Sequence, residues 1–200
     1  MAGPVLRMVK VAFSPRYLLV TNTITCSSLL GIADGIQQYI HGDWDRRQGK
    51  PYNVWRTFRL TAIGILLGPM NHYWYRLLDS RVVFGSLSNI VAKKVTFDLA
   101  VSPVFASTFI SGVSLMEGHS VIDALLEYKR KFFRVFLLDA CVWPPTQAIN
   151  FCFFPSSVRV LYISVVQLVY NCFLSYIKHN ESDGSPTSPL EIKPYGSTAS

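Results

Sequence analysis

The most constraining stretch of the sequence runs from Cys141 to Val160 (CVWPPTQAINFCFFPSSVRV), because it is apolar enough for a membrane yet carries polar side chains at helical spacing. Gln147 and Asn150 lie three residues apart, so they share one face of a helix. Trp143 lies one turn earlier on that side, and Asp139 lies a further turn before it. The spacing predicts a helix whose polar face is turned away from lipid.

Three prolines interrupt this stretch. Pro145 has no N–H to donate, and the two residues that precede the adjacent Pro144 and Pro145 are disfavoured in the α conformation. We therefore expect a short unwound or kinked entry, a helix that begins again at these prolines, and an end or second kink at Pro155. In hydrocarbon, a broken helix is tolerated only where protein or a water-filled cavity covers the freed backbone, which places this stretch inside a helix bundle.

The composition is that of a membrane protein. Half of the 200 residues are hydrophobic and 16% are charged, whereas a soluble domain carries about 25% charged residues. The net charge of +7 suggests anionic lipid head groups or nucleic acid as neighbours, or the ordinary enrichment of Lys and Arg at the ends of membrane helices.

The cysteines stand in apolar runs without a C-x-x-C pair, which makes a zinc site or a disulfide framework unexpected. We expect buried, unreactive thiols, and no metal or other cofactor. The four cysteines are Cys26, Cys141, Cys152 and Cys172.

The apolar segments predict an all-α fold, a multi-span transmembrane helix bundle with four to five proline-kinked spans. One further segment, 117–134, alternates apolar with charged residues and predicts an amphipathic helix on the membrane surface or against a soluble partner. The candidate spans are 17–40, 57–78, about 90–116, 135–154 and 158–177.

Three regions follow from these segments. Residues 1–16 form a basic flank without an acidic residue, which suits a mitochondrial address or cations at the end of a membrane helix. Residues 17–178 form the membrane domain. Residues 179–200 are polar and rich in Ser, Pro and Gly, so we expect a disordered tail.

Small residues recur at a spacing that lets helices approach closely. Gly31 and Gly35 form one G-x-x-x-G pattern, and Gly64 and Gly68 form another. Such patterns serve contacts between two chains or between two helices of one chain.

Several candidate spans carry an ionisable group. Asp34 and His72 stand within apolar runs, and a hydrogen-bonded packing role is the alternative for His72. Lys94 and Asp98 lie one helical turn apart, and we expect them to form an ion pair. The candidate pore-lining residues are Asp34, His72, Lys94, Asp98, Asp139, Gln147 and Asn150.

The pattern W-P-x-x-Q-x-x-N-F-x-x-x-P-x-x-x-R-V at 143–160 resembles the signature of the Mpv-seventeen / peroxisomal membrane protein (twenty-two kilodalton) family. G-P-x-x-H-x-W-Y at 68–75 and K-x-x-x-D at 94–98 extend the resemblance, although Leu99 replaces a glutamine and Pro103 comes one residue early. The matching residues are Gly68, Pro69, His72, Trp74, Tyr75, Lys94, Asp98, Trp143, Pro144, Gln147, Asn150, Phe151, Pro155, Arg159 and Val160.

This resemblance implies a small multi-span protein of the mitochondrial inner membrane, with the peroxisomal membrane as the alternative. Short matches at 18–23 (LLVTNT), 72–75 (HYWY) and 141–144 (CVWP) look most like one mitochondrial branch of the family. That branch implies support of mitochondrial ribosome assembly and translation.

The residues themselves favour two functions, neither of them enzymatic, because no nucleophile stands beside a base in a recognisable motif. The polar faces favour a small-solute pore, unless these groups only hydrogen-bond across helices. Basic residues suit contact with phosphates of lipid or of ribosomal particles, but no RNA- or DNA-binding motif is present, so the ribosome contact is chiefly what the resemblance implies. The other expected partners are the lipid bilayer and a second copy of the chain. The candidate contact residues are Arg46, Arg47, Lys50, Lys129, Arg130 and Lys131.

Overall fold

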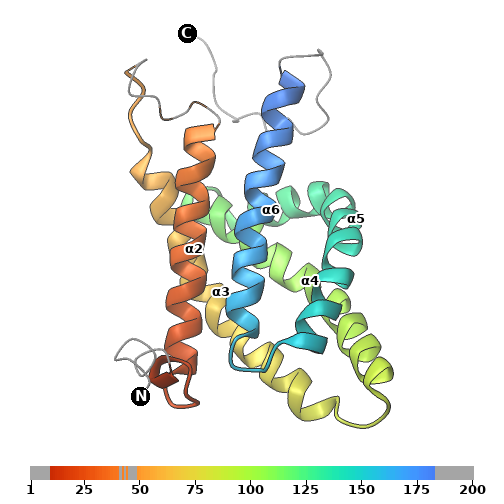
Figure 1. Ribbon diagram of the computed structural model, residues 1–200. Helices are drawn as coiled ribbons and strands as arrows, with labels where there is room; N and C mark the ends of the chain where they lie inside the picture. The colour runs from red at the N-terminus through yellow and green to blue at the C-terminus, as the bar shows by residue number, and fades with distance from the viewer. Residues whose placement is uncertain (1–9, 41, 43, 45–48, 183–200) are drawn as a thin grey trace.

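A computed structural model describes residues 10–40, 42, 44 and 49–182. The described part is built of long α-helices and contains no extended strand. The all-α fold class predicted from the sequence is therefore confirmed. In chain order the main helices are α2 (Leu18–Ile40), α3 (Val54–Arg81), α4 (Leu87–Met116), α5 (Val121–Phe153) and α6 (Arg159–Ser182) (Figure 1).

Three of these helices begin at a side chain that caps their first turn. Asn53 accepts a hydrogen bond from the backbone N–H of Arg56 at the start of α3, at 3.0 Å. Ser86 caps α4, and Ser120 caps α5 by accepting from the N–H of Asp123 at 3.2 Å. Each cap satisfies a backbone donor that the helix leaves free, so the polar residues before the apolar runs set where the helices begin.

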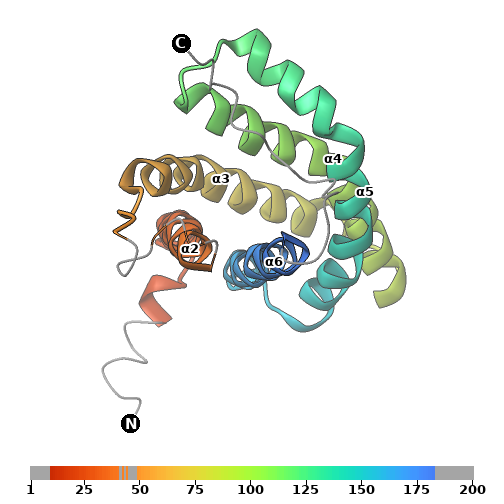
Figure 2. The same ribbon diagram turned by 90° about the horizontal axis from the view of Figure 1, so that it is seen from above.

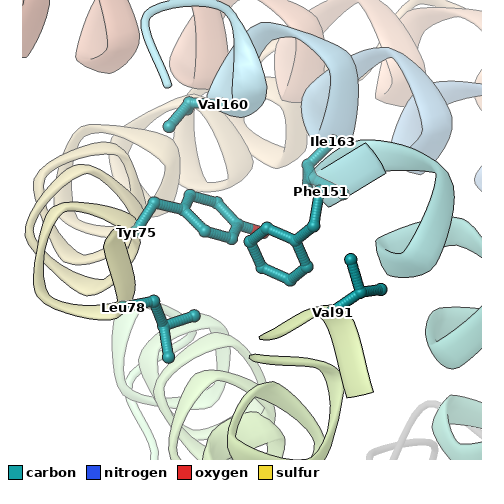
Figure 3. Close-up of a cluster of buried hydrophobic side chains, with 6 residues drawn as sticks. All are labelled: Tyr75, Leu78, Val91, Phe151, Val160 and Ile163. Atoms are coloured by element: carbon teal, nitrogen blue, oxygen red, sulfur yellow. The ribbon is translucent and has the colours of Figure 1, made fainter. Parts of the chain in front are cut away.

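Helix α3 lies between two other layers of the molecule. Seen from above, α2 and α6 lie on one side of α3, and α4 lies on the other side with α5 packed along it (Figure 2). The α2–α3 interface buries Cys26, Leu30, Ile63 and Leu67. A second apolar cluster joins α3 to α4, α5 and α6 (Figure 3), and consists of Tyr75, Leu78, Val91, Phe151, Val160 and Ile163.

Helix α5 corrects two expectations. The predicted amphipathic helix at 117–134 and the predicted span at 135–154 form one continuous helix of 33 residues. Pro144 and Pro145 lie inside it, so the unwound entry expected there is absent. The helix changes direction part-way along its length (Figure 2), as expected where two missing N–H groups leave carbonyls of the preceding turn without their usual partners.

Other boundaries differ by shorter lengths. Helix α3 extends past both ends of the predicted span at 57–78, and Pro69 lies within it. Helix α6 extends to Ser182, while the rest of the predicted tail and residues 1–9 of the predicted flank lie outside the described residues.

Within the described part of the chain, α2 and α4 are long and apolar enough to cross a membrane. The four to five spans predicted from the sequence are therefore not confirmed by length and composition. Large apolar side chains are nevertheless exposed on the outside of the bundle, among them Ile24 and Ile32 of α2, and Phe97 and Val104 of α4. Broad exposed apolar surface of this kind is what a lipid environment accommodates.

Candidate functional site

The ionisable and amide side chains of the interior gather in separate clusters, each at a different helix interface. The first cluster surrounds Asp34, which is 1% exposed where α2 meets the start of α3. Asp34 Oδ2 accepts hydrogen bonds from Gln38 Nε2 at 2.7 Å and from Thr57 Oγ1. Arg56 Nε lies 2.7 Å from Asp34 Oδ1. Asp34 is thus paired within the α2–α3 contact.

Gln38 completes this cluster, because both the oxygen and the nitrogen of its side-chain amide bind the backbone of Asn53. Its Oε1 accepts from the N–H of Asn53 at 2.8 Å, and its Nε2 donates to the Asn53 carbonyl at 3.0 Å. The side chain of Gln38 is fully buried. It joins the end of α2 to the residue that begins α3, a role that the sequence reasoning did not assign.

His72 lies on the same interface, further from the α2–α3 connection. Its Nδ1 lies 3.0 Å from the Nδ2 of Asn22, which is 1% exposed on α2. His72 is therefore a hydrogen-bonded packing residue, the alternative given for it above. The described residues hold no group of three His, Cys, Asp or Glu side chains that could bind a metal ion.

The second cluster contradicts the predicted Lys94–Asp98 ion pair. Lys94 Nζ lies 2.6 Å from Asp79 Oδ1 on α3, and Arg159 of α6 contacts the same carboxylate oxygen. The physical reason is helix packing, because α3, α4 and α6 bring these three side chains together and turn Lys94 away from Asp98. Asp79 was not among the candidate residues. The only sign of it in the sequence was its helical spacing from His72 and Arg76, which places all three on one ionisable face.

Asp98 belongs to a third cluster, in which its partners are neutral. Trp74 Nε1 donates to Asp98 Oδ1 at 2.8 Å, and Gln147 Nε2 donates to Asp98 Oδ2 at 2.6 Å. Gln147 Nε2 also lies 2.7 Å from the hydroxyl of buried Tyr75, and Asn150 Nδ2 donates to Gln147 Oε1 at 2.9 Å. The stripe predicted on α5 therefore faces the bundle interior.

Asp139 is bound on its own helix. Trp143 Nε1 donates to Asp139 Oδ1 at 2.9 Å, one turn along α5. Both residues precede Pro144, so their bond lies in the turn just before the proline pair.

Family-motif residues that carry no polar bond contribute packing. A Cβ added to Gly68 would lie 2.5 Å from the Cα of Thr23, so this glycine lets α2 and α3 touch. Phe151 and Val160 belong to the apolar cluster of Figure 3. Pro69 and Pro144 lie inside helices, and Pro155 follows the end of α5, as expected from its ring.

The candidate basic contacts are described only in part. Lys50, Lys129 and Arg130 are exposed. Arg46 and Arg47 lie outside the described residues, as does the side chain of Lys131.

Taken together, an all-helical chain with apolar outer surface and bonded polar groups inside is the arrangement of an integral membrane protein. Residues 114–175 match the sequence model of the Mpv17 / PMP22 family. The chain is 31% identical to the mitochondrial inner membrane protein Mpv17 of Xenopus laevis over 161 residues, which are 80% of this chain and 88% of the relative. It is 30% identical to protein sym-1 of Neurospora crassa over 162 residues, 80% of this chain and 91% of that one.

A third relative matches this chain over almost the whole length of the relative. The Mpv17 protein of Caenorhabditis elegans is 30% identical over 184 residues, covering 88% of this chain and 97% of the relative. The chain therefore belongs to the Mpv17 / PMP22 family. Names of several relatives support the mitochondrial inner membrane as its location, and those of two PXMP2/4 family proteins of Dictyostelium discoideum fit the peroxisomal alternative. No solved structure matches the chain.

Proposed function

We propose that this mitochondrial inner membrane protein is not an enzyme, and that it supports assembly of the mitochondrial ribosome and mitochondrial translation. The observation that carries the proposal is the set of exposed cations Lys129 and Arg130 on the first half of α5, with Lys50 exposed just before α3. A ribosome presents phosphates, and such cations bind phosphates by releasing counterions.

The packing of α5 keeps these cations on the surface. Tyr128 donates from its hydroxyl to the carbonyl of Pro103 at 2.9 Å, and Ser111 Oγ donates to the carbonyl of Ala124 at 3.3 Å. These contacts attach the apolar side of the first half of α5 to α4, and Ala124 is fully buried there. Lys129 and Arg130 are consequently held outward.

Lys50 lies at the same end of the bundle as the start of α5. Arg59 Nη2 in the second turn of α3 lies 3.4 Å from Glu117 Oε1 at the end of α4. The start of α3 and the α4–α5 connection lie near one another in both ribbon views (Figures 1 and 2). The exposed cations could therefore present one basic surface to a particle outside the membrane.

The test is co-sedimentation of the tagged chain with mitochondrial ribosomal particles after gentle solubilisation. We expect co-migration at low salt that weakens as salt rises, because phosphate contacts are salt-dependent. A chain that sediments only with itself or with other membrane proteins would contradict the proposal.

We infer further that the chain crosses the membrane four or five times. Besides α2 and α4, helix α3 exposes Ile65 and Leu66, and α6 exposes Val165 and Val169. Charged side chains of these helices that would otherwise face lipid, such as Asp79 and Arg159, are paired inside the bundle. Pairing lowers the cost of an ionised group at membrane depth.

A small-solute pore is the second candidate, and unsatisfied polar atoms in the interior favour it. Asn22 Oδ1 and Asn150 Oδ1 are buried without a hydrogen-bond partner among the described residues. Such acceptors in a bundle interior are suited to bind water, which a polar path would supply.

For the pore we expect the reconstituted chain to conduct in a planar bilayer, and Asp98→Asn to shift its ion selectivity. Trp74 and Gln147 donate to different oxygens of Asp98, so Asn keeps an acceptor for one of these two donors while it removes a negative charge from the interior. Leu99→Asn is the neighbouring control. Silent bilayers at high protein density, or unchanged selectivity in Asp98→Asn, would count against the pore.

A further inference from the structure

The cluster of Lys94, Asp79 and Arg159 holds one more positive charge than negative. The side chains of Lys94 and Arg159 are 9% and 10% exposed, and both contact Asp79 Oδ1. Among the ion pairs of the described residues, no second carboxylate contacts either cation. Asp98 lies one turn along α4 from Lys94, but its hydrogen-bond partners are Trp74 and Gln147 and it contacts neither cation. A buried charge without a counter-charge in contact is costly, so this cluster favours a further anion.

Each cation is held in place and keeps donors for such an anion. Lys94 Nζ and the Arg159 guanidinium lie 5.4 and 5.1 Å from the centroid of the Phe151 ring. Arg159 Nε also donates to the carbonyl of Phe154 at 3.1 Å. A lysine has three N–H groups and an arginine five, and the contacts found use one and two of them.

The position of Arg159 strengthens this preference. Arg159 is the first residue of α6, where the helix dipole favours an anion and disfavours a cation. In the same cluster, Asp79 Oδ2 is buried without a partner, which leaves an acceptor for a hydroxyl group.

An apolar groove of about 540 Å³ lies next to this cluster, between the first half of α4 and the last part of α5. Val91 lines the groove and also packs with Phe151 in the apolar cluster (Figure 3). Neither cation lines the groove itself; Val91 borders it, and the Phe151 ring that both cations lie over belongs to the same apolar cluster as Val91. The lining residues are Leu87, Ser88, Val91, Ala92, Val95, Thr96, Pro144, Ala148 and Cys152.

We propose that this is a binding site for one anionic phospholipid. An acyl chain occupies the groove, and the headgroup phosphate accepts hydrogen bonds from Lys94 and Arg159. Basic pockets between membrane helices bind anionic headgroups, and charge-assisted bonds to phosphate are among the stronger hydrogen bonds. A soluble phosphate would leave the groove empty, so the lipid explains both features. This site is independent of the proposed ribosome contact.

The test uses the purified full-length chain in neutral detergent, with binding of phosphatidylglycerol and phosphatidylcholine measured by native mass spectrometry. We expect wild type to prefer phosphatidylglycerol, and Lys94→Gln to weaken that binding about fivefold, the effect of one cation near a headgroup. Lys94→Gln leaves a balanced Asp79–Arg159 pair, so we expect the variant to fold. Lys93→Gln, an equal charge change at an exposed neighbour, is expected to bind as wild type does.

Two further arms separate the lipid from a simple anion. Ala92→Phe fills the groove from an exposed position and is expected to weaken phosphatidylglycerol binding with both cations intact. Inorganic phosphate is expected not to displace the lipid. The proposal is overturned by equal loss in Lys93→Gln and Lys94→Gln, by full binding in Ala92→Phe, or by displacement with inorganic phosphate. Circular dichroism establishes whether each variant is folded. If Ala92→Phe is not folded, Cys152→Trp replaces it as the variant that fills the groove, from α5.

Discussion

At the scale of single residues, glycines decide how closely α2 and α3 approach. A Cβ on Gly64 would lie 2.5 Å from the Cα of Ser27, and one on Gly68 equally close to the Cα of Thr23. Backbone atoms cannot move aside as a side chain can. The G-x-x-x-G pattern at 64–68 therefore serves a contact within one chain, one of the two uses that the sequence allowed.

We expect Gly68→Ala to lower the free energy of unfolding of the detergent-solubilised chain by about 1–3 kcal/mol, because the added methyl group overpacks the α2–α3 contact. The gain in helix propensity opposes this loss but is smaller, about 0.5–1 kcal/mol. Gly35→Ala is the matched control, because its Cβ would meet the Tyr52 hydroxyl at an ordinary 3.5 Å. Thermal unfolding measures both, and a Gly68→Ala chain as stable as Gly35→Ala would contradict the close contact.

Single residues also show which contacts could be predicted from the sequence and which could not. The inward turn of Gln147 and Asn150 followed from helical spacing, which is a local property. The partner of Lys94 did not, because the spacing rule offered Asp98 on the same helix while the structure supplies Asp79 from α3. The Gln38–Asn53 contact was likewise hidden, since it depends on how the α2–α3 connection folds back.

At the scale of elements, α5 shows that two adjacent prolines need not divide a helix. The sequence predicted an amphipathic helix at 117–134 separate from the span at 135–154, and an unwound or kinked entry at the prolines. The two segments instead form one helix, which changes direction part-way along its length. A proline removes only its own N–H bond and displaces one carbonyl, and the turns on either side still form. Thr146 Oγ donates to the carbonyl of Val142 at 2.9 Å, which gives one backbone group beside the bend an additional partner.

The crossing of α4 can be tested from its two ends. Val83 in the connection before α4 and His119 in the connection after it are exposed. In a chain whose four cysteines are replaced by alanine, we expect Val83→Cys and His119→Cys to react with an impermeant maleimide from opposite sides of the inner membrane. The cysteine-free chain is the control. Labelling of both positions from one side would show that α4 does not cross.

At the scale of the whole molecule, charge and apolar surface are separated. Apolar side chains are exposed on the outside of the bundle, buried polar groups lie at helix interfaces, and exposed cations lie just before α3 and in the first half of α5. The net charge of +7 suggested either a negatively charged neighbour or the ordinary enrichment of cations at the ends of membrane helices, and it did not show which cations are exposed. The structure distinguishes buried Arg159 and Lys94 from exposed Lys129 and Arg130, because burial depends on packing between helices.

The most direct test of the proposed function is sedimentation of mitochondrial ribosomal particles from cells that lack the chain and then regain it. We predict that loss of the chain lowers the amount of assembled ribosome and the rate of mitochondrial translation. Wild type should restore both, while Lys129→Gln with Arg130→Gln should restore them less. Arg81→Gln with Lys93→Gln makes the same charge change at exposed positions elsewhere and should restore as wild type does. Normal ribosome assembly and translation without the chain would contradict the account.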